Sequence, residues 1–240
     1  MLTSRAALLL ILVTLVTAAC GTTQVSSRTF FNKAQASNIR KIIIAERADP
    51  ERYVLSSGYS PYRGPFTIIS SALGGLDSAT RSNELETAVQ PAKTLLQQRF
   101  LDDLGAQLKS QGYETVRKPI GAKLDEAAAL AAIGQLAPDE AALIVNVQGS
   151  YIAANPFSAY VPFVVSRVAL FGADHKRLYD QTASWGGQRW RNDAFHMNGG
   201  YGFAVERIPD FPANADKARQ GFYTGSLAVA EHLALGLSRN

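Results

Sequence analysis

The chain contains a single cysteine, Cys20, among its 240 residues. An intramolecular disulfide needs two cysteines, so no covalent cross-link can compensate for a small core. A domain of this length buries about 70% of the surface that its unfolded chain exposes. With 47% hydrophobic and 18% charged residues, the composition is that of a globular protein, and we expect its fold to depend on side-chain packing alone.

The residues before Cys20 have the pattern of a secretory signal. Arg5 supplies a positive charge, and residues 6–19 form an apolar run interrupted only by two threonines. This run matches the roughly 7–15 residues of a signal core and is shorter than the roughly 18 that suggest a membrane span. We predict that residues 1–19 are a cleaved signal peptide.

The segment VTAACG at positions 16–21 resembles a lipobox, the site where bacterial lipoproteins are lipidated on cysteine and cut before it. Ala18 and Ala19 are the small residues expected there, whereas Thr17 replaces the commoner leucine. The resemblance implies that Cys20 carries the lipid and that Gly21, which is not Asp, directs the protein to the outer membrane, facing the periplasm. The alternative is a plain secreted protein with one unrelated cysteine.

Residues 20–37 are mostly polar and are predicted to form a lipidated, flexible tether. Phe30 and Phe31 are the apolar exceptions, and they can either dock onto the domain or touch lipid. Removal of Arg5 leaves a formal net charge of +3, and no run of basic residues suggests nucleic-acid binding.

Segments rich in β-branched and aromatic residues predict strands. The strongest candidates lie at 39–45 and 141–153, while 161–171 and 177–185 are predicted to form a hairpin closed by the turn GADHK. Residues 113–118 are predicted to form a further strand, and weaker strand candidates lie at 52–55 and 66–70.

Apolar residues at helical spacing predict two long helices and one short one. The first covers 92–111, after a polar surface segment at 77–87 and before a stop at Gly112, and a short alanine-rich helix covers 124–136. The predicted buried face of the first consists of Leu96, Phe100, Leu101, Leu104 and Leu108.

The last helix is predicted at 215–237, with Asn214 as its N-cap and Asp216 placed favourably against the helix dipole. Its predicted inner face consists of Ala218, Phe222, Ser226, Val229, Leu233 and Leu237. Strands and helices alternate along 38–240, which predicts one α/β domain built on a mixed sheet with helices packed on it.

The stretches DEAAALAAIGQLAPDEAALIVNVQGSYI and SRVALFGADHKRLYDQTASW, followed by a long final helix, resemble a group of small envelope lipoproteins. This group includes the curli-export lipoprotein, the activators of penicillin-binding proteins and the amino-terminal domain of the periplasmic Tol protein. The similarity covers about residues 90–237 as a pattern of elements. It implies a role in binding or assembly more than in catalysis.

No catalytic or metal-binding motif stands out. The three histidines are His175, predicted in the hairpin turn, His196, near Asp193, and His232, predicted to be partly buried. A metal or catalytic role is conceivable only for His196, and no paired Cys/His spacing supports a metal. We therefore predict no cofactor, no metal and no enzymatic activity.

Three functions remain open: an envelope protein that binds or assembles another envelope component, a subunit of an outer-membrane export or pore complex, and, least favoured, a cell-wall hydrolase. A partner surface is predicted where aromatic residues mix with Gly or Pro, at 57–65, 154–162 and 186–212, the last without clear periodicity. Its candidate residues are Tyr59, Tyr62, Phe157, Tyr160, Arg189, Trp190 and Arg191.

Overall fold

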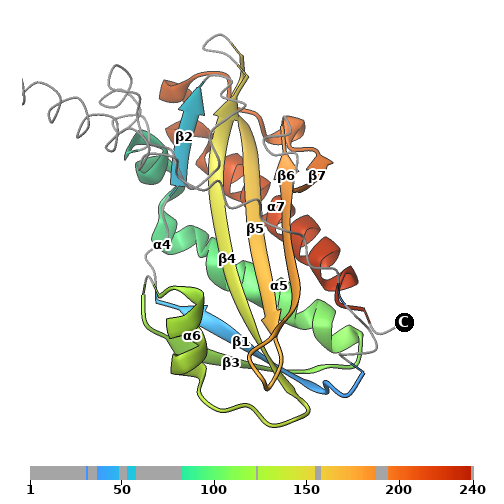
Figure 1. The fold of residues 1–240 in the computed structure, drawn as a ribbon. Helices are drawn as coiled ribbons and strands as arrows, with labels where there is room; N and C mark the ends of the chain where they lie inside the picture. The colour runs from blue at the N-terminus through green and yellow to red at the C-terminus, as the bar shows by residue number, and fades with distance from the viewer. Residues whose placement is uncertain are drawn as a thin grey trace, which may run out of the picture.

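The computed structural model describes residues 31, 37–48, 53–57, 83–122, 124–154, 158–187 and 194–238. Seven strands form one mixed sheet in the order β3-β1-β4-β5-β6-β7, with β2 also paired to β4 (Figure 1). The predicted α/β architecture, with one mixed sheet and helices packed on it, is confirmed.

The first half of the sheet is parallel and is built on β4, Glu140–Ala153. β1, Lys41–Arg47, lies between β4 and the edge strand β3, Glu114–Ile120, and runs parallel to both. β2, Tyr53–Ser57, pairs with the other end of β4. A single strand of 14 residues therefore carries two short partners, one at each end.

The second half contains the predicted hairpin. β5, Val161–Phe171, and β6, Arg177–Gly186, are antiparallel and are joined by the predicted turn, in which His175 has a positive φ of 58°. Ten of the eleven β5 residues are buried, and the exception, Arg167, is partly exposed.

The described part of the segment 186–212 is more regular than its sequence suggests. β7, Phe195–Asn198, adds to the sheet edge parallel to β6, and three short 3-10 helices follow. These are η1, Tyr201–Phe203, η2, Ile208–Asp210, and η3, Pro212–Asn214. The expectation of an aperiodic loop is wrong for the described part of this segment, because long-range pairing with β6 orders a strand whose own sequence, FHMN, is only four residues long.

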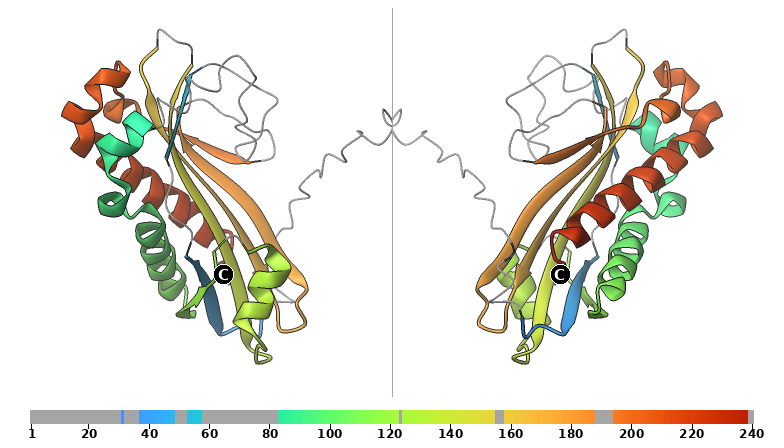
Figure 2. Two further views of the ribbon diagram at one scale, coloured as in Figure 1. Left: turned by 90° about the vertical axis from the view of Figure 1, so that its left-hand side faces the viewer. Right: turned by 90° about the vertical axis from the view of Figure 1, so that its right-hand side faces the viewer.

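One face of the sheet is covered by two long helices, α5, Leu96–Ser110, and α7, Ala215–Leu235 (Figure 2). Both predicted inner faces are confirmed, since every named residue of the two helices is at most 3% exposed. The apolar spacing in the sequence therefore identified the side chains that form the main core.

The first long helix differs from its prediction at its N-terminal end. Leu95 has a positive φ of 47° and separates α5 from a single turn, α4, Pro91–Thr94. Residues 83–89 form a further helical stretch, and Leu85 and Val89 are fully buried. The prediction of a polar surface segment at 77–87 is thus wrong at Leu85, because two apolar residues four apart are enough to form one buried stripe.

The opposite face carries α6, Glu126–Ile133, which is shorter than predicted. Asp125 caps it by accepting a hydrogen bond from the amide of Ala128 at 2.8 Å, and Gly134, with φ of 83°, ends it. Its buried residues pack against Ala45 of β1, against Ala142 and Ile144 near the start of β4, and against Ala169 and Phe171 near the end of β5.

The start of α7 also departs from the prediction. Asn214 occupies the N-cap position, but its side chain accepts no capping hydrogen bond. The side-chain amide of Asn214 instead donates to the carbonyl oxygen of Asp210 at 2.8 Å, which connects the start of the helix to η2. Asp216 lies in the first turn as predicted, where it pairs with Arg219.

Candidate functional site

A cluster of four charged side chains lies on the face of the sheet that carries α6. Arg167 donates to both carboxylate oxygens of Asp180, at 2.9 and 2.6 Å, and its guanidinium lies 3.1 Å from Glu126. Arg177 pairs with the same two acids, at 2.8 Å from Asp180. Two cations and two anions thus form a closed network, and the hydrogen bonds that Arg167 donates to Asp180 raise the pKa of Arg167 above its ordinary value.

Strand periodicity explains why these groups meet. Arg167 pairs with Thr182 across the hairpin, and Ala169 pairs with Asp180, so Arg167 and Asp180 are diagonal neighbours on one face. Glu126, in the first turn of α6, reaches the same point from the other side. Asp180 is only 4% exposed, so its charge is stabilised by the two arginines rather than by water.

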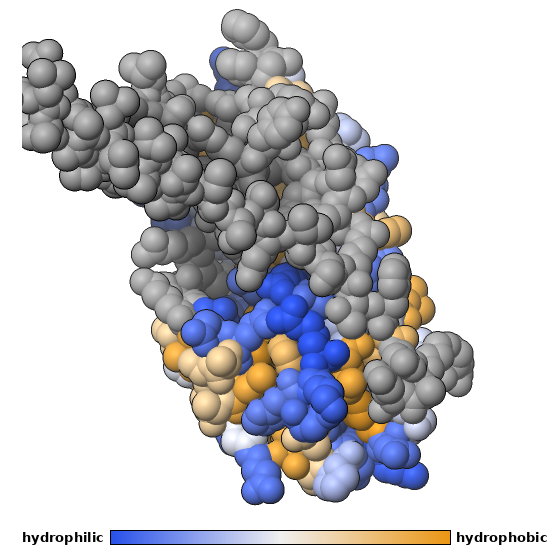
Figure 3. Space-filling model, viewed as in Figure 1, coloured by the Kyte–Doolittle hydropathy of each residue, from blue (hydrophilic) through white to orange (hydrophobic). Residues whose placement is uncertain are grey.

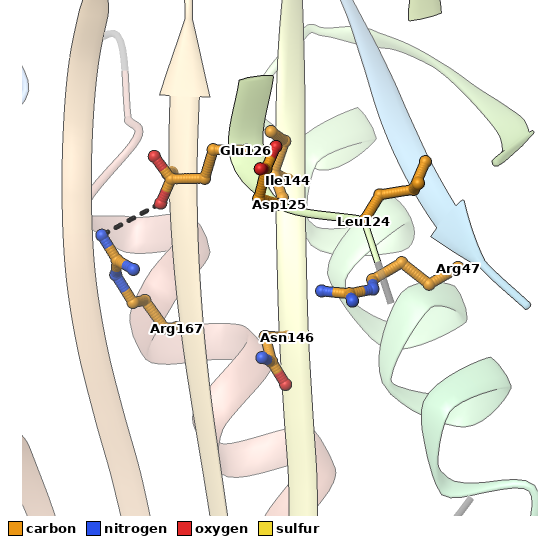
Figure 4. Close-up of a pocket in the computed structure, with 8 residues that line it drawn as sticks. Arg47, Leu124, Asp125, Glu126, Ile144, Asn146 and Arg167 are labelled. Atoms are coloured by element: carbon orange, nitrogen blue, oxygen red, sulfur yellow. Dashed lines mark ion pairs between the residues drawn. The ribbon is translucent and has the colours of Figure 1, made fainter. Parts of the chain in front are cut away.

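A hollow of about 330 Å³ opens beside this network. Its apolar floor and wall come from Leu124, Ile144 and Ala169. Its polar rim consists of Arg47, Asp125, Glu126, Asn146 and Arg167. Figure 4 shows Arg47, from the end of β1, and the Arg167–Glu126 pair on opposite sides of the hollow, with Asn146 between them.

The rim offers hydrogen-bond donors and acceptors in one place. Arginine and asparagine side chains can donate to carboxylates, phosphates or amide carbonyls, while the carboxylates accept from amines and amides. Hydrophilic side chains gather on this face of the molecule between apolar areas (Figure 3). This arrangement suits a polar ligand, such as a peptide segment, better than a purely apolar one.

The sequence did not identify this hollow, because its residues are scattered from position 47 to position 169. One signal was present: Arg167 is the only charged residue in the otherwise apolar segment VPFVVSRVALF. A lone arginine in a strand that is buried on both sides needs acidic partners nearby, which makes its position a candidate site.

Most of the predicted site residues lie outside the described residues: Cys20, Tyr59, Tyr62, Phe157, Arg189, Trp190 and Arg191. Tyr160 is described, and its assignment to a partner surface is wrong. It is only 4% exposed, it exchanges two backbone hydrogen bonds with Val205, and its ring packs against Phe211. Apolar packing on the η helices buries this ring.

The described residues that border the three predicted partner segments nevertheless lie at one end of the sheet. Ser57 pairs with Ala153, Ile152 pairs with Val161, and Gly186 pairs with Phe163. We call this the loop end of the sheet. Segments that are far apart in sequence therefore leave the sheet at the same end, although Tyr160 is the only candidate residue that is described.

Tyr201 is the most exposed aromatic residue among the described residues of the loop end, with 63% of its surface accessible. The hydroxyl of Tyr151 donates to the carbonyl oxygen of Phe203 at 3.0 Å and fixes η1 on the sheet. Burial raises the pKa of Tyr151, so this hydroxyl keeps its proton. Tyr201 is thus presented on a fixed support.

The histidines have structural partners. His196 contacts the hydroxyl of Ser184 at 3.0 Å through Nδ1 and the carbonyl oxygen of Gly187 at 3.1 Å through Nε2. His232 contacts the Gln181 amide at 3.0 Å and stacks on Phe195, with ring centroids 3.6 Å apart. Burial lowers the pKa of His232, as its predicted position beside the apolar stripe suggests.

Within the described ranges, no three His, Cys, Asp or Glu side chains gather in a way that could hold a metal ion. In the same part of the chain, no helix combines the length and the apolar character needed to cross a bilayer.

No protein-family model and no curated protein matches this sequence.

Proposed function

We propose that the chain is a lipid-anchored lipoprotein of the bacterial envelope, held in the outer membrane through Cys20, whose periplasmic domain binds another envelope component and is not an enzyme. The observation that carries the proposal is the lone cysteine placed directly after a short apolar run and two alanines. The likeness to small envelope lipoproteins in the order of elements supports the binding role.

Two features of the domain agree with a binding role. The hollow presents several donors and acceptors around an apolar floor, and the loop end presents Tyr201 on a fixed support. Both are concave or aromatic surfaces of the kinds that dominate recognition in proteins.

The pore-subunit alternative is less well supported. A hairpin that crosses a membrane turns one set of alternate side chains to lipid and the other to a polar interior. β5 lies between β4 and β6, and its side chains are buried on both faces of the sheet except at Arg167. This pattern favours a strand inside a folded core.

Mass spectrometry of the membrane fraction tests the anchor. We expect the mature chain to begin with an acylated Cys20, and Cys20→Ser to lose the lipid and leave the membrane pellet, because acyl chains contribute about 0.8 kcal/mol per buried methylene. Identical fractionation of the wild type and the variant would refute the anchor.

Crosslinking in intact cells tests the binding role. A photoreactive residue at Tyr201 should capture one defined envelope component, and Trp190→Ala combined with Arg191→Ala should abolish that capture with little change in thermal stability. A large loss of stability would instead assign both residues to the core.

Release of fragments from peptidoglycan by the purified protein would favour the cell-wall hydrolase alternative instead.

A further inference from the structure

We propose that the domain stands on the membrane with its hairpin-turn end toward the bilayer and its loop end directed away from it. This inference rests on the proposed lipid anchor at Cys20 and adds the face that meets the phospholipid surface. It depends on where the first described residues contact the domain.

Phe31 is docked onto the domain. Its ring packs edge-on against Tyr179 of β6, with ring centroids 6.3 Å apart, and it joins the main apolar core as a partly buried member. The predicted free tether of residues 20–37 is therefore shorter, since it ends at Phe31. Only ten residues, 21–30, lie between Cys20 and this contact.

The docking point belongs to the hairpin-turn end of the sheet. Tyr179 pairs with Leu170, which pairs with Leu143 near the start of β4. The Tyr179 hydroxyl lies 3.5 Å from the carbonyl oxygen of Leu233, so the C-terminal end of α7 shares this position. β1 also begins here, because Lys41 pairs with Glu140, the first residue of β4.

The length of the connection from Cys20 to Phe31 favours one orientation. Eleven chain steps reach at most about 40 Å when fully extended, and a random chain of that length spans about 20 Å. The loop end lies about 26 Å beyond the docking point, because Tyr151 follows Leu143 by eight positions in β4, at about 3.3 Å per position. The shortest connection therefore places the hairpin-turn end nearest the bilayer.

This orientation gives the two ends different surroundings. Leu235, near the C-terminal end of α7, is 69% exposed and would lie on the membrane side. Tyr201, held beside Pro162 through Gly200, would face the periplasm together with the segments that leave the loop end. A partner that approaches from the periplasm would meet the loop end without crossing the lipid surface.

Energy transfer to the membrane tests the orientation. The full mature protein is reconstituted in vesicles of phosphatidylethanolamine and phosphatidylglycerol that contain an acceptor-labelled phospholipid, with a donor dye on Leu235→Cys or on Tyr201→Cys. Both positions are exposed, and with Cys20 occupied by lipid the introduced thiol is the only one free to react. We expect higher transfer efficiency from position 235 than from position 201.

The outcomes separate this inference from the anchor. Equal transfer from both positions, or higher transfer from 201, in protein that floats with the vesicles overturns the orientation. Failure of the protein to float overturns the anchor itself. Phe31→Ala, which lengthens the free tether from 10 to 16 residues, should reduce the difference between the two positions, and an unchanged difference would overturn the role of Phe31.

Discussion

Phe222 illustrates how single side chains hold the two layers together. Its ring lies 4.8 Å from that of Tyr53 on β2 and 5.4 Å from that of Tyr151 on β4, and none of its surface is exposed. The ring thus joins α7 to two strands that are distant in sequence. Aromatic contacts of this kind add to the free energy gained from burial alone.

Phe222→Ala should lower the free energy of unfolding by about 3–5 kcal/mol, because it leaves a cavity between α7 and the sheet. Urea unfolding followed by circular dichroism measures the change. Tyr201→Ala, at a position that is 63% exposed, is the matched control and should change stability little. A loss below about 1 kcal/mol for Phe222→Ala would mean that the ring is not buried as described.

His232 predicts a dependence of stability on pH. Burial lowers its pKa below the ordinary value of 6.5, so the folded state favours the neutral ring. The neutral ring of His232 contributes its full stabilisation above pH 6.5. This stabilisation is lost as the pH falls through the lowered pKa, because the imidazole binds a proton more readily in the unfolded state than in the folded state.

The free energy of unfolding of the wild type should therefore fall between pH 7 and pH 5. The free energy of unfolding of the His232→Gln variant should fall less steeply over the same range. His175→Asn is the control, since His175 lies exposed in the hairpin turn and asparagine tolerates its positive φ of 58°. Denaturant titrations at each pH measure the slopes. Equal slopes for wild type and His232→Gln would contradict the prediction.

At the scale of elements, α7 approaches the sheet closely through glycine. A Cβ built at Gly225 would lie 2.6 Å from Cε3 of Trp185 and 2.8 Å from Cγ2 of Val164. No real side chain fits at that distance, so the close packing of helix and sheet depends on the missing methyl group.

Gly225→Ala should push α7 away from β5 and β6 and lower stability by about 1–3 kcal/mol, even though alanine is the better helix former by about 1 kcal/mol. Gly202→Ala is the control, because nothing lies within 4 Å of a Cβ built there. Thermal unfolding measures both variants. Stabilisation by Gly225→Ala would show that the contact relaxes without cost.

The elements differ in how well their sequences predict them. The hairpin, the central strand and the inner faces of α5 and α7 follow from local periodicity, which a sequence displays directly. The break at Leu95, the strand β7 and the network around Asp180 depend on contacts between distant segments, so no local pattern marks them. Of the predicted site residues, only Tyr160 is described, and its side chain lies in the core.

At the scale of the whole molecule, β4 connects the two halves of the chain. β1 and β2 pair with it from far upstream, and β5 pairs with it from downstream. A chain that ends at residue 139 lacks β4 and α7, so it can bury neither face of β1 as the full domain does. We expect this fragment to show little secondary structure by circular dichroism, whereas a folded fragment would contradict the central role of β4.

The same arrangement has a consequence for how fast the domain folds. β1 begins at Lys41 but finds its β4 partner about 100 residues later, beginning at Glu140. Sheets that depend on such non-local parallel pairs fold slowly, because loop-closure entropy is lost before the contacts form. If the chain is exported as proposed, this delay would keep it unfolded while it passes through a secretion channel, and folding would begin after its C-terminal half has crossed.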